Sequence, residues 1–194
     1  PSPLFLRIFM AAYFCAGFGY VISATFIVAI VNGLPGLAGQ GGLAFLAIGL
    51  AAAPAAFNWD LIARYTGDIN ALILAALLQI VGIVLPVAVG GLIPTLFGAL
   101  LFGGTFIGMV SLVLTMAGRY YPTRPAKMMS KMTLSYGVAQ IIGPAIVGWL
   151  ATRLGNYSIG LYLAGGVMVI GVVLLAILKK VEKRDAALLL CMKN

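Results

Sequence analysis

The sequence predicts an all-α integral membrane protein, built as a bundle of six transmembrane helices. Two observations of composition carry this prediction: 63% of the 194 residues are hydrophobic, and only 8% are charged. Soluble domains contain about 25% charged residues, so this chain lacks the polar surface that a globule in water needs. The third observation is that the apolar residues fall into runs of about 20, the length that a helix needs to cross the hydrocarbon core.

Short connections separate the six predicted spans, and each contains Gly, Pro, Asn or Asp, which are typical of turns. No sequence remains from which a separate soluble domain could form, so residues 1–194 are predicted to be one domain. Residues 179–194 follow the last span as a charged tail. The predicted spans cover residues 4–31, 41–58, 69–88, 92–117, 131–152 and 157–178.

The basic residues predict the orientation of the bundle. Eleven of the 12 are expected on one side of the membrane, and only Arg153 on the other. This bias predicts that both termini and the loops 59–68 and 119–131 are cytoplasmic. It also accounts for the net charge of +8 without a nucleic-acid partner. The eleven residues are Arg7, Arg64, Arg119, Arg124, Lys127, Lys131, Lys179, Lys180, Lys183, Arg184 and Lys193.

Several kinds of membrane protein are excluded by what the sequence lacks. The chain has no histidine, and Cys15 and Cys191 lie far apart, so we expect no disulfide, metal site or cofactor. An intramembrane protease needs a Ser/His pair or an intramembrane acid pair, and neither is present. The Asn-Pro-Ala loops of six-helix water channels are absent too. The chain begins Pro-Ser-Pro, without an initiator methionine or signal peptide, so we expect it to be part of a longer protein.

Small and polar residues recur at helical spacing within the first span. Such stripes mark faces that a helix turns toward protein or a cavity. Tyr13, Gly17 and Tyr20 fall within one narrow wedge. Tyrosine hydroxyls within a membrane need hydrogen-bond partners or water. The wedge is therefore predicted to be a cavity wall or an ordinary packing face, and the sequence leaves both open.

The fourth span carries a stripe of Gly104, Gly108 and Ser111. Glycines four residues apart let helices approach closely, so ordinary helix packing is the simpler interpretation of the glycine pair.

The fifth span combines residues that weaken helices with one that lipid tolerates poorly. Gln140, Pro144 and Gly148 share one stripe, and Gly143 lies beside it. We predict that this helix packs closely, bends at the proline and turns Gln140 toward something polar. Bridging of two neighbouring helices is the alternative role for Gln140, and also for Gln79 in the third span.

Three stretches resemble one branch of the major facilitator superfamily (MFS), the YbfB/YjiJ-type bacterial transporters. YFCAGFGYVISATFIVAIV resembles the seventh helix of that branch, LFGGTFIGMVSLVLTMAGR the tenth and SYGVAQIIGPAIVGWLA the eleventh. The resemblance runs over residues 4–178. It implies the C-terminal half of a twelve-helix MFS fold, built from inverted three-helix repeats.

The resemblance also implies roles for individual residues. The first and fourth helices of each half line the solute pathway, and the second and fifth face the other half. The predicted pathway residues are Tyr13, Gly17, Tyr20, Ser23, Thr105, Gly108, Ser111 and Gln140. The residues predicted to serve helix packing or kinking are Gly104, Gly143, Pro144 and Gly148.

The connection after the second span lies where this superfamily repeats a cytoplasmic signature of Gly, Asp-Arg and Gly. In the stretch WDLIARYTG, Arg64 and Gly67 match, whereas Ala63 stands in place of the acid and Trp59 in place of the first glycine. Asp60 lies one turn before Arg64 and is predicted to supply the missing carboxylate. Asp60, Arg64 and Gly67 form the predicted conformational-switch loop.

Together these features predict a secondary transporter that moves a small organic solute across the bacterial inner membrane by alternating access. The expected partners are the lipid bilayer, an N-terminal six-helix half or a second copy, the solute, and protons as a candidate coupling ion. The uncharged pathway residues favour neutral, aromatic or amphipathic solutes, and efflux and uptake are both open. The alternative is a non-transporting membrane scaffold, which would bury the Tyr13/Tyr20 face without water.

Overall fold

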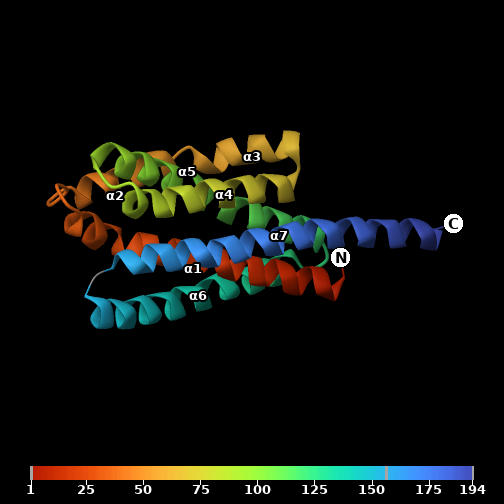
Figure 1. The fold of residues 1–194 in the computed structure, drawn as a ribbon. Helices are drawn as coiled ribbons and strands as arrows, with labels where there is room; N and C mark the ends of the chain where they lie inside the picture. The colour runs from red at the N-terminus through yellow and green to blue at the C-terminus, as the bar shows by residue number, and fades with distance from the viewer. Residues whose placement is uncertain (1, 156, 194) are drawn as a thin grey trace.

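The computed structural model describes residues 2–155 and 157–193, and all regular elements within these ranges are helices (Figure 1). They are α1 (Pro3–Gly33), α2 (Gly41–Ala52), α3 (Ala55–Thr66), α4 (Asp68–Ala88), α5 (Leu92–Tyr120), α6 (Pro125–Leu154) and α7 (Ser158–Lys193).

Five helices are long and apolar enough to cross a membrane on their own: α1, α4, α5, α6 and α7. The short helices α2 and α3 meet the same criterion only as a pair, and a bend of 49° separates them. The structure therefore confirms an all-helical membrane bundle, with the bent pair in the place of the predicted second span.

The bend is located at Pro54, which precedes the first residue of α3. Proline has no backbone N–H and clashes with the preceding helical turn, so it interrupts a helix. The prediction of a loop at residues 59–68 was wrong, because most of this stretch is helical. α3 continues through Thr66, and Gly67 alone links it to α4. Gly67 has φ +92°, a conformation that side-chain-bearing residues rarely adopt.

The helices extend past the predicted spans at the end of the bundle that carries the basic residues, here called the basic end. α5 continues to Tyr120 and α6 begins at Pro125, so the loop predicted at 119–131 shrinks to four residues, 121–124. The predicted tail is helical as far as Lys193. Lys, Leu and Ala recur in this tail, and all three favour helix.

Two helices, α1 and α5, each form the centre of one group of packed helices. α1 packs mainly against α7 and α6, whereas α5 packs against α4 and the α2–α3 pair. Close backbone approach holds α4 and α5 together: a Cβ added to Gly82 would lie 2.7 Å from the carbonyl oxygen of Gly98. Membrane helices associate through such contacts because lipid supplies no hydrophobic driving force between them.

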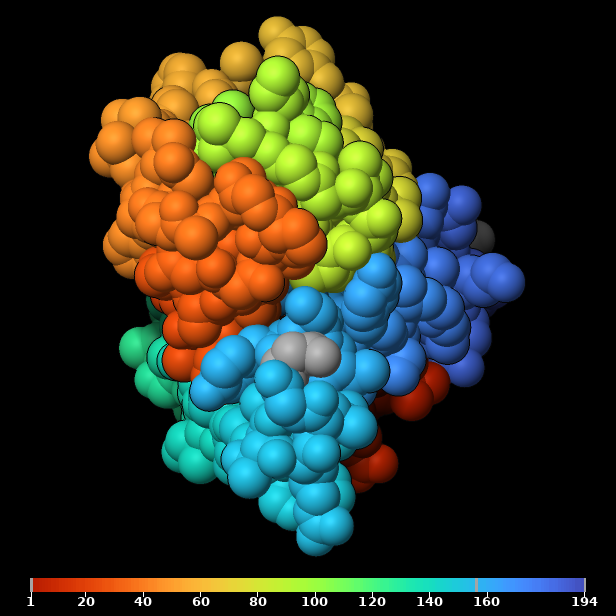
Figure 2. Space-filling model, turned by 60° about the vertical axis from the view of Figure 1, so that its left-hand side comes forward, coloured from red at the N-terminus to blue at the C-terminus, as the bar shows by residue number. Residues whose placement is uncertain are grey.

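The first turn of α1 and the last turn of α7 lie at the basic end, on the right of Figure 1. The opposite end holds the C-terminal ends of α1, α4 and α6. Figure 2 shows this region, where α2 in orange lies against the yellow-green start of α5, and the neighbouring ends of α6 and α7 lie below them.

Candidate functional site

An aromatic cluster lies near the middle of the bundle, where α1, α5 and α6 meet. Tyr13 and Tyr20 come from α1, Tyr136 from α6, and Phe102 and Phe106 from α5. The ring centroids of Tyr13 and Tyr136 are 4.6 Å apart, and those of Tyr20 and Phe106 are 4.9 Å apart. Tyr20 also lies 5.8 Å from Tyr136, so its ring connects the α5 and α6 sides of the cluster.

Gly17 allows α6 to approach α1 at this point. It lies on α1 between the two tyrosines, and an added Cβ would be 2.7 Å from the backbone carbonyl oxygen of Tyr136. The structure therefore brings together three of the predicted pathway residues, Tyr13, Gly17 and Tyr20. Their common neighbour Tyr136 was missed, although its position four residues before Gln140 was a usable signal.

The α5 residues predicted to line the pathway lie elsewhere. Thr105 is 2% exposed, and its hydroxyl donates to the carbonyl oxygens of Leu101 and Phe102 on its own helix. Ser111 is half-buried. Phe106, adjacent to Thr105 in sequence, reaches Tyr20. The α5 side chains whose rings contact Tyr20 are thus Phe102 and Phe106.

The side chain of Trp59, on α3, packs against Gly104 and Gly108 of α5. The indole N–H of Trp59 donates to the carbonyl oxygen of Gly104 over 2.6 Å. A Cβ on Gly108 would collide with the same indole ring, whereas a Cβ on Gly104 would meet no atom within 4 Å. Gly108 thus lies against the indole ring of Trp59, and the glycine pair accommodates a side chain in place of a neighbouring helix backbone.

The predicted α6 residues fall into two groups. Gly143 packs inward, because an added Cβ would lie 2.8 Å from a methyl carbon of Val21 on α1. Gln140 and Pro144 are half-buried, and a Cβ at Gly148 would meet no atom within 4 Å. Within the described bundle, therefore, Gly143 is a packing position and Gly148 is not. Ser23, on α1, is 2% exposed.

The predicted switch loop lies at the basic end of α3. The expected ion pair is present: a guanidinium nitrogen of Arg64 lies 3.0 Å from a carboxylate oxygen of Asp60. Both side chains are well exposed, at 72% and 49%. Exposed pairs of this kind contribute about 0–1 kcal/mol to stability.

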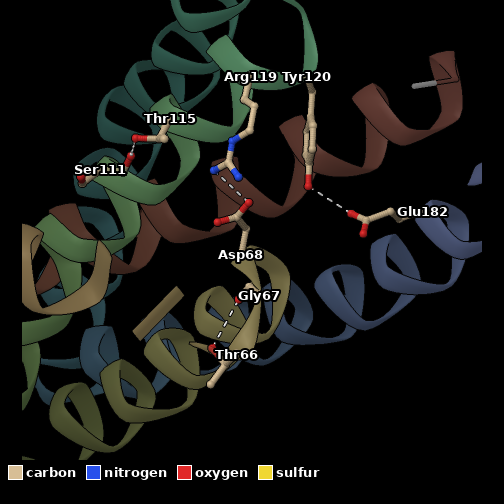
Figure 3. Close-up of polar contacts among 8 residues, drawn as sticks. All are labelled: Thr66, Gly67, Asp68, Ser111, Thr115, Arg119, Tyr120 and Glu182. Atoms are coloured by element: carbon tan, nitrogen blue, oxygen red, sulfur yellow. Dashed lines mark hydrogen bonds and ion pairs between the residues drawn. The ribbon is translucent and has the colours of Figure 1, made fainter. Parts of the chain in front are cut away.

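A second ion pair beside it was missed in the sequence. Arg119, at the end of α5, lies 3.0 Å from Asp68, whose side chain is only 14% exposed (Figure 3). Asp68 begins α4, where a carboxylate also interacts favourably with the helix dipole. In the same view, the hydroxyl of Tyr120 donates to a carboxylate oxygen of Glu182 on α7 over 3.2 Å. Because α4, α5 and α7 all contribute, these contacts join three helices at the basic end.

Two hollows lie on the surface of the bundle. A polar cleft of about 390 Å³ lies between α3, α4 and α5, and both ion pairs line it together with Gly67 and Thr115. A larger, mostly apolar groove of about 600 Å³ lies between α5 and α6. Its lining includes Thr133 and Gly137, which flank Tyr136 on α6.

Comparisons with known proteins agree with this architecture. The family model described as "Uncharacterised MFS-type transporter YbfB" matches residues 2–176. No curated protein sequence matches the chain significantly. Among solved structures, the chain is similar to the in meso crystal structure of the POT family transporter PepTSo, with a TM-score of 0.78 and 15% sequence identity. That match covers 93% of this chain but 38% of PepTSo, so the chain spans well under two thirds of that transporter's length.

The structural likeness shows the fold, and the family model covers nearly the whole chain. Both agree with the resemblance drawn from the first, fourth and fifth spans. The chain belongs to the YbfB-type transporter family of the major facilitator superfamily.

Proposed function

We propose that this bundle is one half of a secondary active transporter, which moves a small organic solute across the bacterial inner membrane by alternating access. Membership of an MFS transporter family supports transport as the activity. In such folds two bundles rock against each other around a solute site near the middle of the membrane.

The observation that carries this proposal is the position of the aromatic cluster. Tyr13 and Tyr20 flank the middle of the 31-residue α1, the level at which such transporters bind their solutes. Phe106 and Tyr136 add polarizable ring surface from two further helices. The cluster therefore offers a solute contacts from three helices at mid-membrane.

The second bundle would pack against α6 and the α2–α3 pair. Large apolar side chains stay exposed on both, for example Ile141 at 76% and Phe57 at 74%. On α6, Gly137 and Gly148 are glycines with open space beside them. A helix face of this kind supports close sliding contact with another helix. The partner in this proposal is an N-terminal six-helix half, or a second copy of this bundle.

The basic end faces the cytoplasm in this proposal. Eleven of the 12 basic residues lie there, and Arg153 lies at the opposite end of α6. Membrane proteins retain such excess positive charge on the cytoplasmic side.

A transport assay on the intact protein that contains this bundle tests the proposal. Proteoliposomes with an imposed pH gradient and membrane potential are incubated with a mixture of small polar and aromatic metabolites, and their contents are measured by mass spectrometry. We expect at least one solute to accumulate only when both protein and gradient are present. A membrane scaffold would show no gradient-dependent accumulation of any solute, and that result would overturn the proposal.

A further inference from the structure

We propose that the aromatic cluster binds an uncharged aromatic solute that carries a hydrogen-bonding group. This inference rests on the proposed function and assigns the solute class and two further binding residues, Phe106 and Tyr136.

The geometry of the rings favours a flat ligand. The ring planes of Tyr20 and Phe102 are inclined by only 10°, those of Tyr20 and Phe106 by 32° and those of Tyr13 and Tyr136 by 34°. The rings of Tyr20 and Phe102 are stacked and those of the other two pairs are tilted, with centroid separations of 4.6–6.2 Å. Offset stacking at such distances stabilises aromatic pairs beyond their buried area. A planar aromatic ring can extend this stack, whereas a puckered saturated ring cannot.

The hydroxyl groups point to a polar partner. Among the described residues, no hydrogen bond is formed by the hydroxyls of Tyr13, Tyr20 or Tyr136. Phenylalanine would fill nearly the same space without a hydroxyl. None of these three hydroxyl oxygens is fully buried, so a solute can reach them. Three such hydroxyls in one cluster therefore suit a solute that brings its own donor or acceptor, such as an amide, a hydroxyl or a ring N–H.

The charges around the cluster disfavour an ionised solute. All four acidic residues lie at the basic end, so this bundle offers no carboxylate to neutralise a cation. The nearest cations along the two helices are Arg7, six residues before Tyr13, and Lys131, five residues before Tyr136. At a rise of about 1.5 Å per residue they lie more than one turn toward the basic end, beyond contact with a ring at Tyr20. Burying an unpaired charge there would be unfavourable.

Four probes of one size test the assignment by separating aromaticity from charge. They are benzamide, cyclohexanecarboxamide, benzoate and benzamidinium, and their dissociation constants are measured by ligand-observed NMR on the intact protein in nanodiscs. Because stacking is lost in the saturated ring, we expect benzamide to bind about tenfold more tightly than cyclohexanecarboxamide. We also expect it to bind more tightly than either charged probe.

Matched variants test the residues. Tyr136→Phe keeps the ring and removes the hydroxyl, so we expect benzamide to bind about three- to tenfold more weakly. Phe106→Leu should reduce the preference for benzamide over cyclohexanecarboxamide. The controls are Tyr162→Phe and Phe97→Leu, whose side chains are 47% and 55% exposed on α7 and α5; neither should change binding.

Three results would overturn the assignment. They are equal binding of the aromatic and saturated amides, tighter binding of a charged probe, and equal losses in the site variants and their controls. Absence of binding by all four probes would also count against it. These measurements need no transport, so the solute class can fail while gradient-driven accumulation succeeds, and the reverse outcome is equally distinguishable.

Discussion

At the scale of single residues, the fit between Trp59 and α5 illustrates how a glycine on one helix accommodates a side chain from another. The indole lies over Gly108 and donates its N–H to the carbonyl oxygen of Gly104, 45 residues away in sequence. Trp59 is 5% exposed. A methyl group at position 108 would force this ring out of place, whereas position 104 has room for one.

These two glycines therefore provide a matched pair of substitutions. We expect Gly108→Ala to destabilise the protein by about 1–3 kcal/mol, the usual cost of overpacking a filled interior. Gly104→Ala adds a methyl group to open space and should be neutral or slightly stabilising, since alanine favours helix by about 1 kcal/mol over glycine. Thermal unfolding of both variants in detergent measures the difference. Equal melting temperatures would show that the Trp59 contact does not constrain position 108.

Sequence reasoning found part of this residue-level picture. Tyr13, Gly17 and Tyr20 share one helix, so helical spacing alone could group them. Phe106 and Tyr136 complete the aromatic cluster and Trp59 covers Gly108, but each of the three comes from a helix other than the one it contacts. Which helices pack together, and at what rotation, depends on contacts between distant segments that a single sequence does not display. The need for a small residue at 108 was therefore predictable, and its partner was not.

At the scale of helices, hydropathy predicted where the spans lie but missed the break at Pro54. Apolar residues continue on both sides of the break, so a hydropathy pattern passes through it without a signal. Membrane helices also tolerate proline, because neighbouring helices can satisfy the freed backbone groups. The helix ends were placed too early for a related reason: charged residues end an apolar run but do not end a helix.

The short connection between α3 and α4 places two ion pairs of different burial close together, and these can be compared directly. Asp60→Asn removes an exposed pair and should change the free energy of unfolding by less than about 1 kcal/mol. Asp68→Asn removes a largely buried carboxylate that also interacts with the start of α4, and we expect a loss of about 1–2 kcal/mol. Denaturation of the two variants at low and high salt gives both values. A larger loss for Asp60→Asn would contradict the assignment of Asp68 as the structural carboxylate at this end.

At the scale of the whole molecule, the charges are confined to the two ends of the bundle, and this constrains how transport could be coupled to protons. A proton carrier needs an ionisable group at membrane depth. The four acids of this bundle, Asp60, Asp68, Glu182 and Asp185, all lie at the basic end.

We therefore expect any proton-coupling acid to belong to the partner bundle. Single Asp→Asn or Glu→Gln substitutions of these four residues should leave the proton-to-solute ratio unchanged. Solute-induced proton flux in proteoliposomes measures that ratio. An Asp60→Asn protein that carries solute downhill at the normal rate, but no longer moves protons, would refute this expectation.

The central claim is that the bundles alternate between two states, which expose opposite ends of α6 to water in turn. Reciprocal cysteine labelling tests this claim most directly. Single cysteines replace Thr133, in the groove near the basic end, and Gly148, in open space toward the opposite end, after Cys15 and Cys191 have been replaced. A third cysteine at Val173, a 54% exposed position on α7, serves as the control. The intact protein is labelled in nanodiscs, where a membrane-impermeant maleimide reaches both faces, with and without the transported solute. The account predicts that solute raises the labelling rate at one α6 position, lowers it at the other and leaves Val173→Cys unchanged; rates at 133 and 148 that stay constant, or that change together, would contradict it.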